Sequence, residues 1–160
     1  DMLTIDILDS PITRQEIIDS IQHLKGKKAA SIDNILPEFI KHADDIVLPY
    51  LELLFNIILD NGQFPSTWTI GIIIPIHKGG NINNPDNYRG INLLSILGKV
   101  FTYIINKRLT FWANALDKID ESQAGFRAGY STMDDIFILN SIVQKCLSVK
   151  GTKLYALFVD

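Results

Sequence analysis

Residues 68–94 read WTIGIIIPIHKGGNINNPDNYRGINLL and contain the sharpest change of composition in the chain. β-Branched residues dominate 68–77, and this composition favours a strand. Residues 78–87 are dense in Gly, Asn, Asp and Pro, as turns are, and a second short apolar segment follows over 88–94. The stretch therefore predicts a β-hairpin over residues 69–94.

Helical patterns precede this hairpin. Residues 12–25 begin with Thr13 and Glu16 at the spacing of a capping box and continue with apolar residues at helical intervals. Two further helices are predicted to carry a proline in their first turn, one at Pro37 and one at Pro49. The chain up to the hairpin is therefore expected to be helical.

A long helix is predicted directly after the hairpin, over residues 96–114 with Ser95 as its cap. One face of it is apolar, and three cations are expected to lie largely off that face. The apolar positions are Leu97, Val100, Phe101, Ile104, Ile105 and Leu109, and the cations are Lys99, Lys107 and Arg108.

The last two predicted elements are a helix and a strand. The helix begins near Thr132, runs to about Val149 and is closed by Gly151. Residues 153–160, KLYALFVD, are apolar at consecutive positions, which is typical of a strand buried on both faces. Together the patterns indicate an α+β fold in which helices outnumber strands.

Composition limits the class of protein. The 160 residues are 47% hydrophobic and 21% charged, which fits one globular domain. We expect no membrane association, because the apolar runs are too short to span a bilayer and no secretion signal is present. The one cysteine, Cys146, has no disulfide partner and is expected to be buried. The start at Asp1 and the abrupt end suggest a chain truncated at both ends.

Charge is unevenly distributed along the chain. Residues 1–60 carry eleven acidic and five basic side chains, whereas residues 61–128 carry four acidic and seven basic ones. The middle of the chain is therefore where an anionic partner would be attracted. A net charge of +3 over such a length is also common on ordinary protein surfaces.

Three places in the sequence offer chemistry. In the hairpin, Lys78 and Arg89 could together hold phosphate oxygens, or they could simply be two solvated cations. In residues 123–132, QAGFRAGYST, an aromatic and a cation precede a helix, which suits contact with a nucleic acid. The alternative there is that Phe126 fills the core.

The third place is Asp160, at the end of the predicted strand. A carboxylate in such a position is a common Mg²⁺ ligand. Phosphoryl transfer needs a second carboxylate, and the sequence offers none that is suitably placed.

These segments, taken in order, resemble the reverse transcriptases of non-LTR (LINE-type) retrotransposons. The resemblance is carried by residues 68–109, by QAGFRAGYST at 123–132 and by YALFVD at 155–160, and it extends from Ile12 to the end of the chain. Ser31 stands where most members have glycine, which affects only the expected loop geometry.

The resemblance implies part of a right-hand polymerase. It divides the chain into a helical entry region (1–67), a fingers hairpin (68–94), helices with the QAGFR loop (95–150) and the first palm strand (153–160). If that strand lacks its neighbours, residues 154–159 should be less covered than their composition demands.

The resemblance also implies roles for individual residues. Lys78 and Arg89 would hold the triphosphate of the incoming deoxynucleotide, and Asp160 would be the first catalytic aspartate, a ligand of both Mg²⁺ ions of a two-metal nucleotidyl transfer. Four residues of the loop would lie near the template and primer: Gln123, Gly125, Phe126 and Arg127.

The implied partners are an RNA template, a DNA primer and deoxynucleoside triphosphates, used inside the cell in the nucleus or cytoplasm. The 160 residues alone are expected to be inactive, because the paired palm aspartates of the family are absent from them. Two alternatives are a decayed or domesticated relic that binds nucleic acid, and a reverse transcriptase of the group II intron type.

Overall fold

The computed structural model describes residues 7–42 and 44–158. The chain divides into two units, residues 1–113 and 114–160. None of the described helices is long and apolar enough to cross a membrane. The described part mixes helices with one antiparallel hairpin, which confirms the predicted α+β class at that level.

Before the hairpin, the described part of the first unit contains the helices α2 (Arg14–His23), α3 (Pro37–His42) and α4 (Asp44–Asn61). Thr13 caps α2 in the predicted capping box: its backbone N–H donates to Glu16, and the Glu16 N–H donates to its side chain. Pro49 was predicted in the first turn of its helix, but it lies inside α4, which begins five residues earlier. The helix therefore continues through a position that lacks a backbone N–H.

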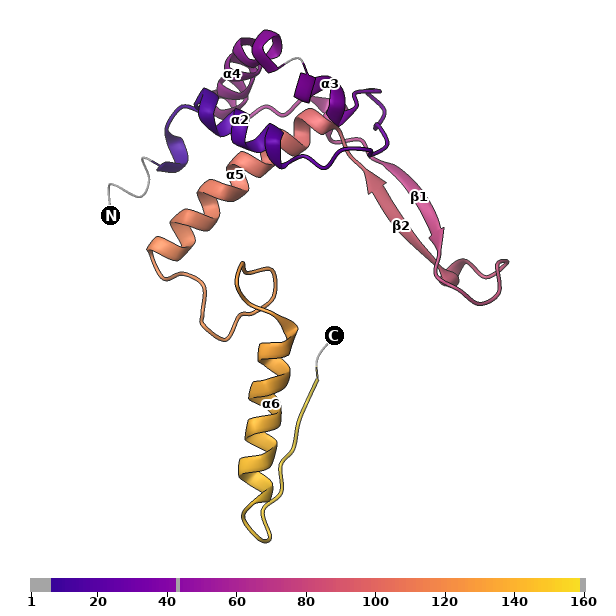
Figure 1. The fold of residues 1–160 in the computed structure, drawn as a ribbon, viewed down its shortest axis with the longest axis vertical. Helices are drawn as coiled ribbons and strands as arrows, with labels where there is room; N and C mark the ends of the chain where they lie inside the picture. Colours follow the sequence, from indigo (N-terminus) through magenta and orange to yellow (C-terminus); the bar gives the residue numbers. More distant parts are fainter. Residues whose placement is uncertain (1–6, 43, 159–160) are drawn as a thin grey trace. The chain divides into compact units, whose positions relative to one another are not determined.

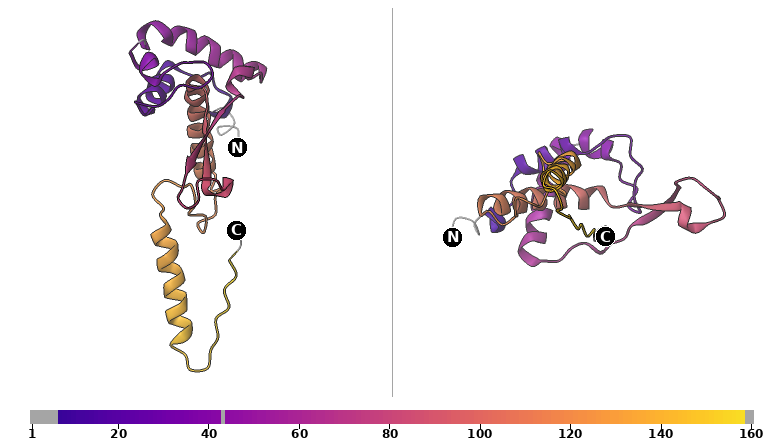
Figure 2. Two further views of the ribbon diagram at one scale, coloured as in Figure 1. Left: turned by 90° about the vertical axis from the view of Figure 1, so that its right-hand side faces the viewer. Right: turned by 90° about the horizontal axis from the view of Figure 1, so that it is seen from below.

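After a short 3-10 turn, η1 (Ser66–Trp68), the hairpin follows as predicted. Strand β1 (Ile72–His77) pairs antiparallel with β2 (Tyr88–Leu93), and the loop between them contains a second 3-10 turn, η2 (Pro85–Asn87). Figures 1 and 2 show the two strands leaving the helices of this unit as a ribbon.

Helix α5 (Ile96–Ala115) closes the core of the first unit. Its apolar side packs with α2 and α4 around an edge-to-face cluster of aromatic rings. In that cluster Phe55 and Phe101 lie 5.4 Å apart and Phe64 and Trp68 lie 5.1 Å apart, measured between ring centroids. The fully or nearly buried apolar residues are Ile12, Ile17, Ile21, Ile40, Leu51, Phe55, Ile58, Trp68, Ile96, Val100, Phe101 and Ile104.

The face of α5 differs from the predicted one at its C-terminal end. Leu109 was expected in the apolar face and is exposed, whereas Arg108 was expected outside it and is buried. The Arg108 guanidinium is buried because it donates to both oxygens of Glu16 and to the carbonyls of Leu8, Ser10 and Pro11. Its charge and its donors are therefore satisfied inside the protein.

The second unit contains α6 (Thr132–Leu147), which starts after Ser131 as the sequence indicated and ends two residues earlier than predicted. Cys146 is half-buried rather than buried. The predicted strand after α6 is wrong for its described part, because residues 153–158 are irregular. A strand needs a neighbour to accept its backbone hydrogen bonds, and neither of the described strands pairs with this segment. Figure 2 shows it turning back along α6 as extended chain.

Lack of cover over this segment was itself expected from the sequence. The described residues of the range are exposed, with Tyr155 at 85%, Leu157 at 89% and Phe158 at 81%. That expectation is confirmed for 154–158, while residue 159 lies outside the described residues.

Candidate functional site

The hairpin register decides where its two cations lie. Ile76 pairs with Arg89, and the Lys78 backbone N–H donates to the Asn87 carbonyl at 2.7 Å, which extends the ladder by one pair. Side chains alternate along a strand, so Lys78 lies on the same face as Ile76 and Arg89. Lys78 and Arg89 are thus diagonal neighbours across the two strands, close enough to act on one ligand.

The loop that joins the strands holds this arrangement in place through its own hydrogen bonds. The Asn87 side-chain amide donates to the Asn81 carbonyl at 2.9 Å, and the Tyr88 hydroxyl donates to the Ile82 carbonyl at the same distance. Gly80 has a φ of +83°, and a Cβ there would lie 2.8 Å from the Asn87 side-chain nitrogen. Glycine at this position is therefore required by the turn.

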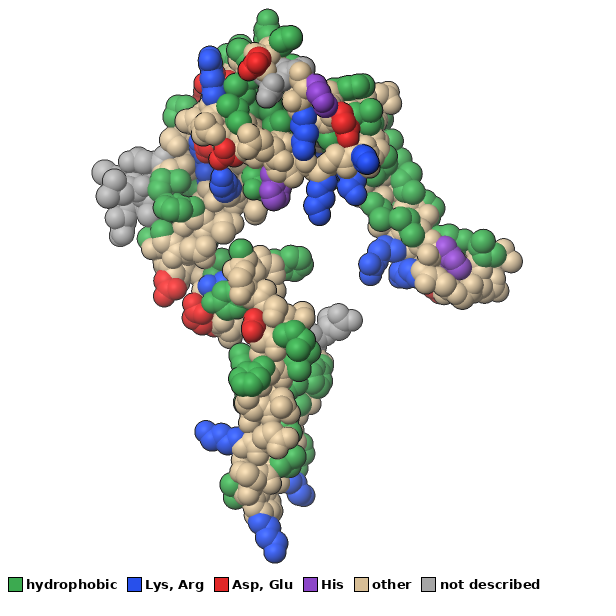
Figure 3. Space-filling model, in the orientation of Figure 1, with side chains coloured by type: hydrophobic (Ala, Val, Ile, Leu, Met, Phe, Trp, Pro, Cys, Tyr) green, Lys and Arg blue, Asp and Glu red, His purple; other side chains and the backbone are tan. Residues whose placement is uncertain are grey.

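Both cations are available for a ligand. Lys78 and Arg89 are exposed, and in the described part of the chain neither forms an ion pair. Arg89 offers a planar fork of N–H donors and Lys78 a mobile point charge. Figure 3 shows Lys and Arg side chains gathered on one side of the hairpin. The face can therefore receive an anion with several oxygens, such as a phosphate chain.

The QAGFR loop of the second unit places its residues differently. Arg127 is largely covered and organises the loop: it donates to the Asp120 carbonyl at 3.0 Å and lies over the Tyr130 ring, 4.2 Å from the centroid. Gln123 donates to the Gly125 carbonyl at 3.2 Å. The side chains of Arg127 and Gln123 are thus engaged within their own loop.

Phe126 is the free side chain of this loop. It is fully exposed, so the alternative in which it fills the core is wrong. Its φ of +62° is unusual for a bulky residue. Tyr130 donates a 2.6 Å hydrogen bond to Glu121, which raises the pKa of Tyr130 and, together with the Arg127 charge, lowers the pKa of Glu121. The loop presents one aromatic ring to solvent.

The carboxylate predicted to bind a metal, Asp160, lies outside the described residues. Among residues 7–42 and 44–158, no three His, Cys, Asp or Glu side chains lie close enough together to hold a metal ion.

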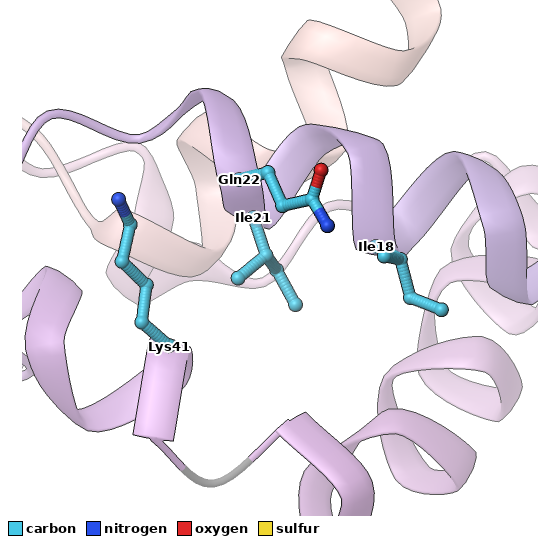
Figure 4. A pocket seen from close by; sticks show the side chains of 4 residues that line it. All are labelled: Ile18, Ile21, Gln22 and Lys41. Atoms are coloured by element: carbon cyan, nitrogen blue, oxygen red, sulfur yellow. The ribbon is translucent and has the colours of Figure 1, made fainter.

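One further pocket in the first unit has a modest volume of about 250 Å³. Figure 4 shows it between α2 and α3, lined by Ile18, Ile21, Gln22 and Lys41. The sequence predicted no functional role for any of these residues. With one amide, one cation and two apolar side chains, the pocket offers no set of groups for catalysis.

Sequence comparison shows which known proteins this chain is similar to. The chain is 33% identical over 153 residues to a probable RNA-directed DNA polymerase from transposon BS of Drosophila melanogaster. The aligned region covers 94% of this chain and 17% of the relative. It is 34% identical over 154 residues to the RNA-directed DNA polymerase from mobile element jockey of the same species, covering 94% of this chain and 16% of the relative.

A third relative is a probable RNA-directed DNA polymerase from transposon X-element of D. melanogaster, 33% identical over 161 residues, with 99% of this chain and 17% of the relative covered. The chain thus spans about a sixth of the length of the curated relatives it matches. No family model matches the chain.

Proposed function

Because this chain is a segment of the non-LTR retrotransposon type of reverse transcriptase, we propose that it supplies the nucleotide-binding hairpin of an RNA-directed DNA polymerase. The substrates would be deoxynucleoside triphosphates, which the enzyme would add to a DNA primer in the order set by an RNA template. The reaction would take place inside the cell, in the nucleus or cytoplasm. The observation that carries this proposal is the shared face of Lys78 and Arg89 in the hairpin register.

The proposed reaction is nucleotidyl transfer. The primer 3′-hydroxyl attacks the α-phosphorus of the nucleotide, the bond to the β-phosphate oxygen breaks, and pyrophosphate leaves. Arg89 would donate hydrogen bonds to oxygens of the β- and γ-phosphates, and Lys78 would add a positive charge beside them. Negative charge grows on these oxygens in the transition state, so fixed cations there stabilise it.

Asp160 and the QAGFR loop complete the proposal. Mg²⁺, bound through Asp160, would supply charge neutralisation at the phosphates. Of the loop residues Gln123, Gly125, Phe126 and Arg127, Phe126 is the one whose ring is free to stack on a template or primer base.

Primer extension tests the proposed function. The complete reading frame that contains this chain should extend a DNA primer on an RNA template when deoxynucleotides and Mg²⁺ are supplied. Asp160→Ala should abolish synthesis, and Lys150→Ala, an exposed cation in the second unit, should not. Full activity of Asp160→Ala would contradict the role of this carboxylate. A wild-type protein that binds the template but makes no product would favour the non-catalytic relic.

A further inference from the structure

A groove of about 380 Å³ lies at the base of the hairpin in the first unit. Its walls come from the segment after α2, the first residue of α3, and the end of β2 together with the start of α5. Three lysines line it, Lys25, Lys28 and Lys99, together with apolar residues that include Ile91, Leu93 and Ile96. Lys25 and Lys28 lie close together in the sequence, but nothing in the sequence links them to Lys99.

The charge of this lysine groove is unbalanced. No Asp or Glu belongs to its described lining, and none of its three lysines forms an ion pair with a described residue. Figure 3 shows Lys and Arg side chains gathered where the hairpin leaves the helices. Like charges held near one another repel, and a polyanion that lies between them relieves that repulsion.

Part of the lining of the lysine groove lies on the face of β2 that carries Arg89. Ile91 and Leu93 line the groove and alternate in phase with Arg89, whereas Asn92, which also lines it, lies on the opposite face. At ~3.3 Å per residue, Leu93 and Arg89 are about 13 Å apart along the strand. The cations therefore form two groups separated by an apolar surface, which suits an elongated anion better than a compact one.

We propose that the lysine groove binds the phosphate backbone of single-stranded RNA, with sugars and bases lying against the apolar residues between the two groups of cations. This inference deepens the proposed function, because it gives the template strand a specific contact surface. Lysines on flexible stems hold phosphates without reading the sequence, so the groove should accept any base sequence. Binding at the groove needs neither catalysis nor Mg²⁺, so it can fail or succeed independently of polymerase activity.

Fluorescence anisotropy tests this inference. The 160-residue chain is titrated into a fluorescein-labelled single-stranded RNA of mixed sequence, in EDTA and without nucleotides. The variant Lys25→Gln/Lys28→Gln/Lys99→Gln should weaken binding at least tenfold. The control Lys145→Gln/Lys150→Gln/Lys153→Gln removes the same charge from exposed positions of the second unit and should change binding less than twofold.

Salt dependence separates phosphate contacts from loss of folding. Each phosphate contact to a single strand contributes about −0.7 to the slope of log K against log salt concentration. The groove variant should therefore lose about two units of that slope, and Lys25→Arg/Lys28→Arg/Lys99→Arg should restore both affinity and slope. Equal losses in the groove and control variants, an unchanged slope, or no rescue by arginine would each overturn the proposal. Binding of tripolyphosphate at the groove that leaves the anisotropy of the bound RNA unchanged would also overturn the proposal.

Discussion

Arg108 and Glu16 form a bidentate ion pair in which the guanidinium Nε lies 2.7 Å from one carboxylate oxygen and Nη2 lies 2.9 Å from the other. The pair joins α5 to the first turn of α2. The remaining Arg108 donors reach three backbone carbonyls just before α2. One side chain therefore fixes how the N-terminal part of the first unit lies on the helix that follows the hairpin.

Replacing Arg108 should strongly destabilise the protein. Arg108→Leu leaves the partly exposed Glu16 and three carbonyls without their donor, and the loss of hydrogen bonds to a charged group should cost about 1.5–3 kcal/mol. The neighbouring Lys107 pairs with Asp19 at 3.2 Å, but both side chains are exposed. Lys107→Leu should therefore cost below about 1 kcal/mol. Urea unfolding of both variants measures the difference, and equal midpoints would show that Arg108 is not the anchor described.

The same pair predicts how stability depends on pH. Although partial burial raises the pKa of Glu16, hydrogen bonds from Arg108 and Thr13 outweigh it and lower the pKa to about 2, from 4.5. A lowered folded pKa means that the contribution of Glu16 is complete above about pH 4.5 and is lost as the pH falls towards 2. Urea midpoints should thus fall in that window for the wild type and fall less steeply for Glu16→Gln. An identical pH dependence in the two proteins would refute this account of the pKa.

Helix α6 exposes apolar side chains all around it. Seven are exposed: Met133, Ile136, Phe137, Ile138, Leu139, Ile142 and Leu147. A contiguous apolar surface of this kind binds hydrophobic dyes. The 160-residue chain should therefore enhance the fluorescence of the dye ANS in native buffer.

Matched variants locate the dye-binding surface. Phe137→Ser/Ile138→Ser should lower the ANS signal by about half, because it interrupts the surface of α6. Ile46→Ser/Leu53→Ser removes two side chains of similar exposure from α4 and should lower the signal much less. Equal decreases in both double variants would show that α6 is not the main apolar surface.

Elements with a strong local pattern could be predicted from the sequence. The capping box of α2 and the Gly/Asn-rich turn of the hairpin are local features, and both form where they were expected. The sequence also predicted that Lys78 and Arg89 belong to one hairpin, but the face on which each lies follows from the register that the structure shows.

Features that depend on tertiary contacts could not be predicted in this way. Arg108 looks like a surface cation by helical periodicity, and only its distant partners in residues 8–16 explain its burial. The lysine groove likewise requires Lys99 to meet the loop after α2, which no local pattern indicates. The segment 153–158 has strand composition, but a strand forms only where a neighbour pairs with it.

Nucleotide dependence of primer extension tests the central claim about the hairpin most directly. In the complete reading frame, Arg89→Ala should raise the KM for deoxynucleotides by about tenfold or more, because hydrogen bonds to a charged group contribute about 1.5–3 kcal/mol. Lys78→Ala should act in the same direction, and Lys150→Ala should leave the KM unchanged. A KM for Arg89→Ala equal to that of the wild type, with the protein folded, would contradict the proposal that this face of the hairpin holds the triphosphate.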